Sequence, residues 1–153
     1  MTRRNAVIHL FYCSNSMTES EVQSLQERFS DDGLRMLSLP CSGKMTIPYL
    51  LKAFETGGDG AVICSCPPRE CRNLEGNLRA SKRVGAVDEL MDEIGLGAGR
   101  VLMIAKGQGD LAKVIDAIES LRAKHTAAAA PVRTALPGVE STSHRRERRG
   151  NAA

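Results

Sequence analysis

Five cysteines are the residues of this chain best suited to carry chemistry, and all lie in its first half. They are Cys13, Cys41, Cys64, Cys66 and Cys71. Four thiolates brought together can hold a zinc ion or an iron–sulfur cluster, and a single activated thiolate can act as a nucleophile. The spacing contains C-x-C and C-x4-C. It lacks the C-x2-C pair that is typical of structural zinc sites. Ligands dispersed in this way suit an iron–sulfur cluster at least as well as zinc.

A second interpretation starts from Cys66, because Arg72 follows it at the C-x5-R spacing of tyrosine-phosphatase loops. Such loops cradle an oxyanion with backbone N–H groups, which also activate the thiolate. Here Pro67 and Pro68 remove two of those donors, and Glu70 would place a carboxylate inside the cradle. A phosphatase or arsenate-reductase enzyme is therefore kept as an alternative. A zinc-stabilised interaction module is a further one.

The histidines offer no acid–base set that would indicate an enzyme. His9 lies in a predicted buried strand, and His125 and His144 lie at or in the C-terminal tail. A single histidine in a strand is usually packed in the core. We therefore expect no catalytic residues in the body of the chain.

The segments between and after the cysteines alternate between strand-like and helix-like patterns. Short apolar runs predict four strands, over residues 6–12, 34–39, 61–64 and 101–105. Apolar stripes at helical spacing follow each run. Thr18 with Glu21 forms a capping box for the first helix, Thr46 can cap the second, and Asp110 can cap a last helix over 111–124.

The third helical region is expected to begin near Pro68 and to end among glycines. Its apolar residues recur at roughly helical intervals: Leu74, Leu78, Val84, Val87, Met91 and Ile94. Basic residues also follow Cys66 closely: Arg69, Arg72, Arg79, Lys82 and Arg83. The positive charge of these side chains, together with that of a helix N-terminus, would stabilise negatively charged thiolates nearby. A solvated basic helix face explains them equally well.

Strands separated by helices must be parallel, with right-handed crossovers. The order βαβαβαβα therefore predicts an α/β fold, a small doubly wound sheet of four parallel strands of the flavodoxin-like or Rossmann-like kind. If the strand order is 2-1-3-4, the loops after the first three strands lie side by side. Cys13, Cys41, Cys66 and Cys71 would then converge at the carboxyl edge of the sheet, where such folds bind ligands. Cys64 lies in the third strand, where a buried apolar role is a stronger alternative.

The composition indicates one globular domain followed by a tail. The chain has 153 residues, of which 42% are hydrophobic and 25% charged. We predict a domain over residues 1–125 and a disordered basic tail over 126–153. The net charge of +3 comes from that tail, and aromatic residues make up only 3%. A neutral body with few aromatic side chains argues against nucleic-acid binding.

Other features of the sequence bear on location. No apolar run approaches the roughly 20 residues of a membrane span, and no cleavage site follows the first apolar run. We therefore expect a cytoplasmic protein without a membrane segment. In that reducing compartment a framework of structural disulfides is not expected.

Several short blocks together identify a family. They are residues 11–13 (FYC), 40–44 (PCSGK), 51–55 (LKAFE), 57–60 (GGDG) and 66–72 (CPPRECR). With them the chain resembles the delta subunit of methyl-viologen-reducing hydrogenase, a small iron–sulfur protein associated with heterodisulfide reductase complexes. The resemblance continues through residues 75–77 and 82–83 and covers roughly residues 7–121.

The resemblance implies a cytoplasmic electron-transfer subunit with a 2Fe-2S cluster and no substrate chemistry of its own. Members of the family pass electrons between a hydrogenase or dehydrogenase partner and the flavin-bearing large subunit of a heterodisulfide-reductase-like complex. Such complexes can perform flavin-based electron bifurcation. Related subunits accompany formate dehydrogenases and methylenetetrahydrofolate reductases.

The resemblance also implies a set of cluster ligands. The first block of the family is C-x-x-C, and here Ser16 stands at its second position. The second block of the family matches Cys41, and the third block, a pair of cysteines, matches Cys66 and Cys71. The implied ligands are Cys13, Cys41, Cys66 and Cys71. Cys64 stands where many members have a small residue, and it is a reserve ligand in place of the missing cysteine.

Overall fold

A computed structural model describes residues 5–31, 33–107 and 109–126 of the chain. Its strands form one four-stranded parallel sheet, as predicted, and their order is β2-β1-β3-β4. The strands are β1 (Ile8–Cys13), β2 (Leu34–Leu39), β3 (Gly60–Ser65) and β4 (Val101–Ala105). The helices are α1 (Glu19–Arg28), α2 (Ile47–Glu55), α3 (Gly76–Glu93) and α4 (Leu111–Thr126), with a 3-10 turn η1 (Ser42–Lys44) before α2.

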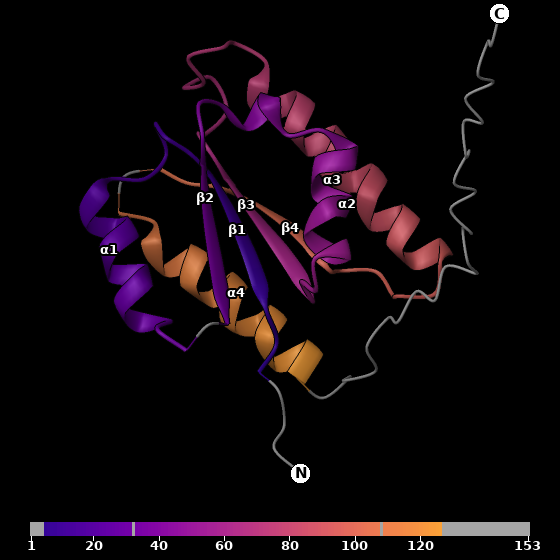
Figure 1. Cartoon of the computed structure of the whole chain (residues 1–153). Coiled ribbons are helices and arrows are strands. Elements are labelled where there is room, and N and C mark those ends of the chain that lie inside the picture. Colours follow the sequence, from indigo (N-terminus) through magenta and orange to yellow (C-terminus); the bar gives the residue numbers. More distant parts are fainter. Residues whose placement is uncertain (1–4, 32, 108, 127–153) are drawn as a thin grey trace, which may run out of the picture.

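The helices cover both faces of the sheet (Figure 1). α1 and α4 pack on one face, and α2 and α3 pack on the other. Side chains that alternate along β3 divide between the two cores: Val62 and Cys64 join the core under α1 and α4, while Ile63 joins the core under α2 and α3. Because β3 is buried along its whole length, its carboxyl end lies inside the molecule.

The capping predictions for the first two helices are confirmed. Thr18 Oγ1 accepts a hydrogen bond from the backbone N–H of Glu21, and the Glu21 carboxylate accepts one from the backbone N–H of Thr18. Thr46 Oγ1 accepts from the backbone N–H of Tyr49 at the start of α2. These local bonds satisfy donors that a helix N-terminus otherwise leaves unpaired.

The predicted start of the third helix is wrong. α3 begins at Gly76 rather than near Pro68, because two residues of the preceding loop have positive φ angles, 70° at Arg69 and 55° at Leu74. A backbone in that region cannot continue a right-handed helix. The segment from Cys66 to α3 is instead a loop of turns.

The predicted apolar stripe of α3 is correct only in part. Val84, Val87 and Met91 are buried with Ala80 at a 4-3-4 spacing, as expected of one helix face. The exposed fractions of the other three residues are large: 85% for Leu74, 57% for Leu78 and 59% for Ile94. The later helix start explains this for the leucines, since Leu74 lies outside α3 and Leu78 points away from Ala80.

The remaining boundaries agree with those expected or differ by one or two residues, and β2 and β4 have the predicted bounds. β1 and β3 are shifted or lengthened at their ends, and α4 runs to Thr126, two residues beyond the predicted end. The predicted tail begins at residue 126, but Thr126 is the last residue of α4; the rest of the predicted tail, residues 127–153, lies outside the described part of the chain. Among the helices that the structure describes, none is long and apolar enough to span a membrane.

Candidate metal centre

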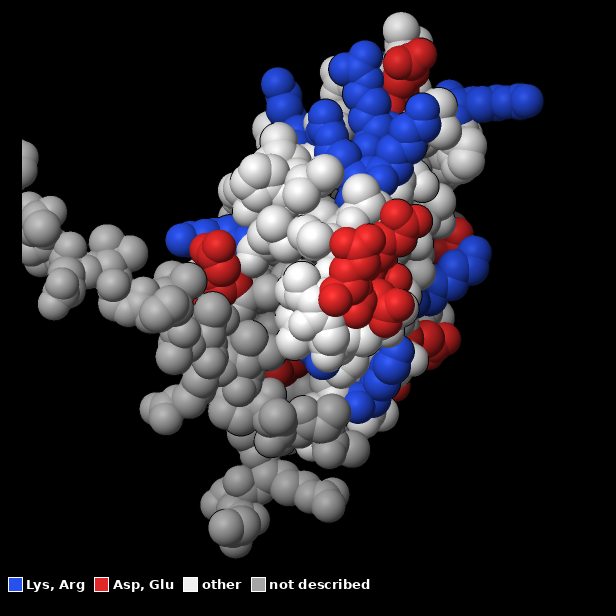
Figure 2. All heavy atoms as spheres, turned by 90° about the vertical axis from the view of Figure 1, so that its right-hand side faces the viewer, with Lys and Arg blue, Asp and Glu red and all other residues white. Residues whose placement is uncertain are grey.

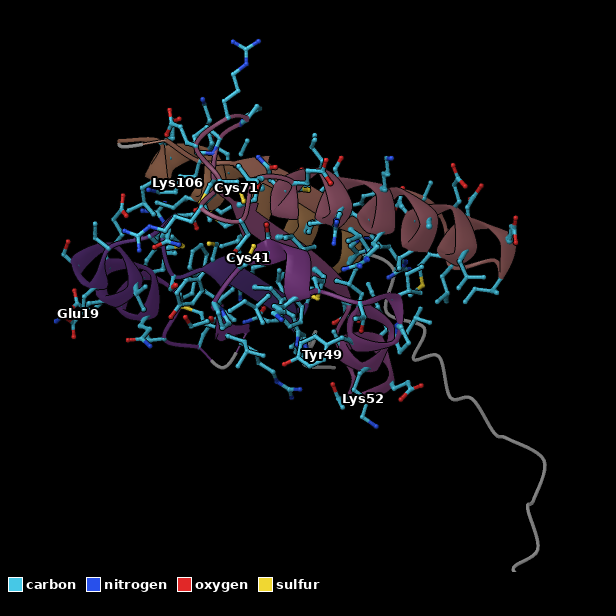
Figure 3. The ribbon with its side chains drawn as sticks, turned by 90° about the horizontal axis from the view of Figure 1, so that it is seen from above. Glu19, Cys41, Tyr49, Lys52, Cys71 and Lys106 are labelled. Carbon is cyan, nitrogen blue, oxygen red and sulfur yellow. The ribbon has the colours of Figure 1, made fainter. Side chains whose placement is uncertain are left out.

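Four cysteine side chains meet at the carboxyl edge of the sheet. Cys13 ends β1, Cys41 precedes η1, and Cys66 and Cys71 lie in the loop between β3 and α3. They form one buried group, with exposed fractions of 2%, 5%, 4% and 9% in that order. Figure 3, which looks onto this edge, shows Cys41 and Cys71 close together. We call these four residues the four-thiol site.

The four-thiol site is organised as two pairs of sulfur atoms. The Sγ atoms of Cys13 and Cys66 are 3.7 Å apart. The Sγ atoms of Cys41 and Cys71 form the second pair, since both lie beside Gly76. Two thiolates on one tetrahedral metal ion, each about 2.3 Å from it, would be separated by about 3.8 Å. The first pair therefore has the spacing that two ligands of one metal ion need.

Two glycines allow η1 and the start of α3 to approach the site. A Cβ atom on Gly76 would lie 2.4 Å from the Sγ of Cys41 and 3.2 Å from the Sγ of Cys71. A Cβ atom on Gly43 would lie 2.7 Å from the Cα of Gly76. Any larger side chain at Gly76 would fill the space beside the two sulfur atoms.

Backbone N–H groups favour the charged form of one of these thiols. Burial works to raise the pKa of Cys71, but hydrogen bonds from the backbone of Asn73, Asn77 and Gly76 and from the thiol of Cys41 outweigh it. The pKa of Cys71 is lowered as a result. These donors belong to the first turn of α3 and the turn before it, where helix N–H groups have no partner within the helix.

The opposite shift occurs at Cys66. Burial, the hydrogen bond with Cys13 and the nearby charges of the other thiols raise the pKa of Cys66 to about 12. A nucleophilic cysteine needs a lowered pKa. Arg72 is exposed to solvent. These features disfavour the phosphatase-like interpretation of the C-x5-R spacing.

Cys64 lies apart from the four-thiol site. It packs in the core under α1 and α4, and burial raises the pKa of its thiol. Ser16 links the two regions, because its hydroxyl donates to the carbonyl oxygen of Cys13 at 2.8 Å and lies 3.5 Å from the Sγ of Cys64. Cys64 thus neighbours the residue that stands at the second position of the C-x-x-C block.

The sequence pattern did not point to Lys106, which follows β4 and is only 3% exposed. Its Nζ donates to the carbonyl oxygen of Ser16 at 3.0 Å and forms an ion pair with Glu21 at 2.8 Å. Figure 3 shows it at the same edge of the sheet as Cys71. Its burial depends on the contact between the end of β4 and the first turn of α1, so the local sequence carries no signal for it.

The four-thiol site offers donors that suit either a zinc ion or an iron–sulfur cluster. Its thiols come as two neighbouring pairs. A 2Fe-2S cluster takes four cysteine ligands, two on each iron. All five cysteines of the chain are free thiols.

Comparisons with known proteins give one family. The family model of the delta subunit of methyl-viologen-reducing hydrogenase matches residues 8–127. The chain is 34% identical over 91 residues to the iron-sulfur subunit of the F420-non-reducing hydrogenase vhu of Methanocaldococcus jannaschii, a match that covers 60% of this chain and 68% of that protein. The Methanococcus maripaludis subunit of the same name is 33% identical over 88 residues, covering 58% and 66%. The matched part is thus about two thirds of these relatives.

Another relative is a much longer protein. The chain is 32% identical over 79 residues to one subunit of the ferredoxin:CoB-CoM heterodisulfide reductase of Methanosarcina mazei. That match covers 50% of this chain but only 10% of the reductase subunit. A segment similar to this chain is therefore a small part of a much longer polypeptide there.

Proposed function

Because the chain belongs to the methyl-viologen-reducing hydrogenase delta subunit family, we propose that it is an electron-transfer protein whose four-thiol site holds a 2Fe-2S cluster. The observation that carries this proposal is the burial of two thiol pairs together at the carboxyl edge of the sheet. The names of the relatives, which describe iron–sulfur subunits, support it.

The residues of the chain have distinct roles in this proposal. Cys13, Cys41, Cys66 and Cys71 would be the ligands, and the bound cluster would supply one-electron redox chemistry. The backbone N–H of Gly43 donates to the Sγ of Cys41 at 3.3 Å and, like the donors around Cys71, would stabilise thiolate charge. Burial would exclude water from the sulfur atoms. No residue is needed as an acid or a base.

The partners are proposed from the relatives. The similar segment in the long heterodisulfide reductase polypeptide suggests that the separate chain associates with a reductase subunit of that type. The hydrogenase relatives suggest a hydrogenase as the electron donor. From the family resemblance alone, a formate dehydrogenase or methylenetetrahydrofolate reductase would fill the same role in related complexes. We place this exchange in the cytoplasm. The domain over residues 1–125 would carry it, with the residues from 126 to 153 as a basic tail.

An electron-exchange experiment tests the role. The protein is purified without oxygen, reduced, and mixed in a stopped-flow apparatus with the flavin-containing heterodisulfide reductase subunit encoded by the same genome. We expect the absorbance of the oxidised cluster to return as electrons pass from the cluster to the flavin of the reductase subunit. A cluster that exchanges no electrons with this reductase subunit or with the hydrogenase would contradict the electron-transfer role.

A further inference from the structure

The charges of α3 are segregated along its length. Its basic residues, Arg79, Lys82 and Arg83, all lie in the N-terminal half, and its acidic residues, Asp88, Glu89, Asp92 and Glu93, all lie in the C-terminal half. A helix dipole favours the opposite distribution. Figure 2 shows Lys and Arg side chains gathered at the end of the molecule that carries the four-thiol site, with a group of acidic side chains farther along. Two of these residues have roles inside the fold: Asp88 accepts hydrogen bonds from the backbone N–H groups of Gly99, Arg100 and Val101, and Arg83 donates to carbonyl oxygens before α2. The exposed basic residues Arg79 and Lys82 are not explained in this way.

Exposed leucines lie among these basic side chains. Leu74 and Leu78 are 85% and 57% exposed, although large apolar residues are usually buried. At 100° per residue, Leu78 shares the outward face of α3 with Arg79 and Lys82. The surface therefore combines apolar side chains with a basic surround, as the centre and rim of a protein interface do.

The loop presents its leucine at an energetic cost. Leu74 has a φ angle of 55°, in the left-handed region that side chains with a Cβ seldom adopt. Its backbone N–H donates to the carbonyl oxygen of Cys71 at 3.1 Å. This hydrogen bond ties the turn that carries Leu74 to a residue of the four-thiol site. Non-glycine residues held in this region cluster at functional sites.

The basic side chains are poorly neutralised within the chain. In the described ranges, Arg79 has one ion pair, with Glu75 at 3.5 Å, and both side chains are about two-thirds exposed. Arg69, Arg72 and Lys82 have no ion pair there, and all three are exposed. Positive charge is thus available to an acidic partner.

We propose that this surface docks an acidic face of the heterodisulfide reductase subunit named above. The surface, called here the basic docking surface, consists of Arg69, Arg72, Leu74, Leu78, Arg79 and Lys82. The inference rests on the proposed function and deepens it, because Cys66 and Cys71 belong to the same loop. A partner bound here would sit beside the four-thiol site, and electron transfer is fast only over short distances.

A charge-reversal variant tests the electrostatic part. The full-length, cluster-loaded Arg72→Glu/Lys82→Glu variant is compared with the wild type in binding to the same reductase subunit at about 50 and 300 mM salt. We expect the affinity to fall about tenfold at low salt, mainly through a slower association rate, and the difference to shrink at high salt. Arg83 is left unchanged because its guanidinium donates to the carbonyl oxygens of Gly43 and Met45.

The matched control is Lys52→Glu/Lys113→Glu, which makes the same change in net charge on α2 and α4. Both lysines are exposed and each has one ion pair with a residue three positions away. This variant should bind within about twofold of the wild type. Equal weakening of both double variants would overturn the proposal, because it would mean that only net charge matters.

Leu74→Asn tests the apolar part, since asparagine tolerates the left-handed conformation. It should retain its iron and speed dissociation several-fold. Unchanged binding by both the leucine and the charge-reversal variants would overturn the docking surface alone. A wild-type protein that carries its cluster but does not bind the reductase subunit would overturn the docking proposal and the partner, while leaving the cluster proposal standing.

Discussion

Gly76 and Cys41 approach each other so closely that a Cβ atom on Gly76 would lie 2.4 Å from the cysteine Sγ. The first residue of α3 thus forms a wall of the four-thiol site, and only glycine leaves room for the sulfur atom. Gly85, farther along the same helix, has nothing within 4 Å of such an atom. The two glycines therefore have different roles in one helix.

Gly76→Ala should displace the sulfur atoms of Cys41 and Cys71 and lower the iron content strongly. Gly85→Ala should keep its iron and stabilise the protein by about 0.5–1 kcal/mol, because alanine has the higher helix propensity. Iron analysis and thermal unfolding of both variants check this prediction. A normal iron content in Gly76→Ala would show that the glycine is not needed for the site.

Serine variants separate the four-thiol site from the fifth cysteine. Replacement of Cys13, Cys41, Cys66 or Cys71 should each remove most of the iron, because each takes away one of four ligands. Cys64→Ser should keep its iron, since Cys64 packs in the core under α1 and α4. Iron and sulfide analysis after anaerobic purification gives the answer. Loss of iron in Cys64→Ser, with retention in one of the other four, would give Cys64 the role of a ligand.

Lys106→Met should destabilise the protein by about 1–3 kcal/mol, because it leaves buried hydrogen-bond acceptors without their donor. The lost contacts are those to the carbonyl oxygen of Ser16 and to Glu21. Lys113→Met is the control, since that lysine is exposed and its ion pair is expected to contribute less than about 1 kcal/mol. Chemical denaturation measures both effects. Equal stability of the two variants would show that the Lys106 contacts contribute little.

The ion pair of Glu21 should also make stability depend on pH. Burial works to raise the pKa of Glu21, but hydrogen bonds from Lys106 and Thr18 outweigh it and lower the pKa below 4.5. The stabilising contribution is therefore fully present above about pH 4.5 and is lost as the pH falls through the lowered pKa of the folded state. Glu21→Gln should reduce the melting temperature at pH 7 and much less near pH 3. An equal effect at both pH values would contradict this assignment.

Much of the fold could be predicted from local sequence signals. Thr18 and Thr46 satisfy the first donors of their own helices, so their roles are visible without the tertiary structure. The convergence of Cys13, Cys41 and the Cys66–Cys71 loop follows from the parallel order of the strands. Ligand assignment itself remains a proposal that the cysteine variants test.

Other features depend on contacts that local signals do not contain. The start of α3 is set by positive φ angles at Arg69 and Leu74, and neither residue type indicates such a conformation. The burial of Lys106 depends on α1 lying opposite the end of β4. The outward position of Leu74 and Leu78 becomes visible only once the helix start is known, so the basic docking surface could not be recognised from sequence.

The content of the four-thiol site is the most direct test of the proposed function. The wild-type protein is purified without oxygen, its iron and sulfide are counted, and its absorption and EPR spectra are recorded before and after addition of dithionite. We predict two iron and two sulfide ions per chain, visible absorbance that dithionite bleaches, and an S = 1/2 signal in the reduced form. A colourless protein without iron after careful reconstitution, or one with stoichiometric zinc, would contradict the assignment of a 2Fe-2S cluster.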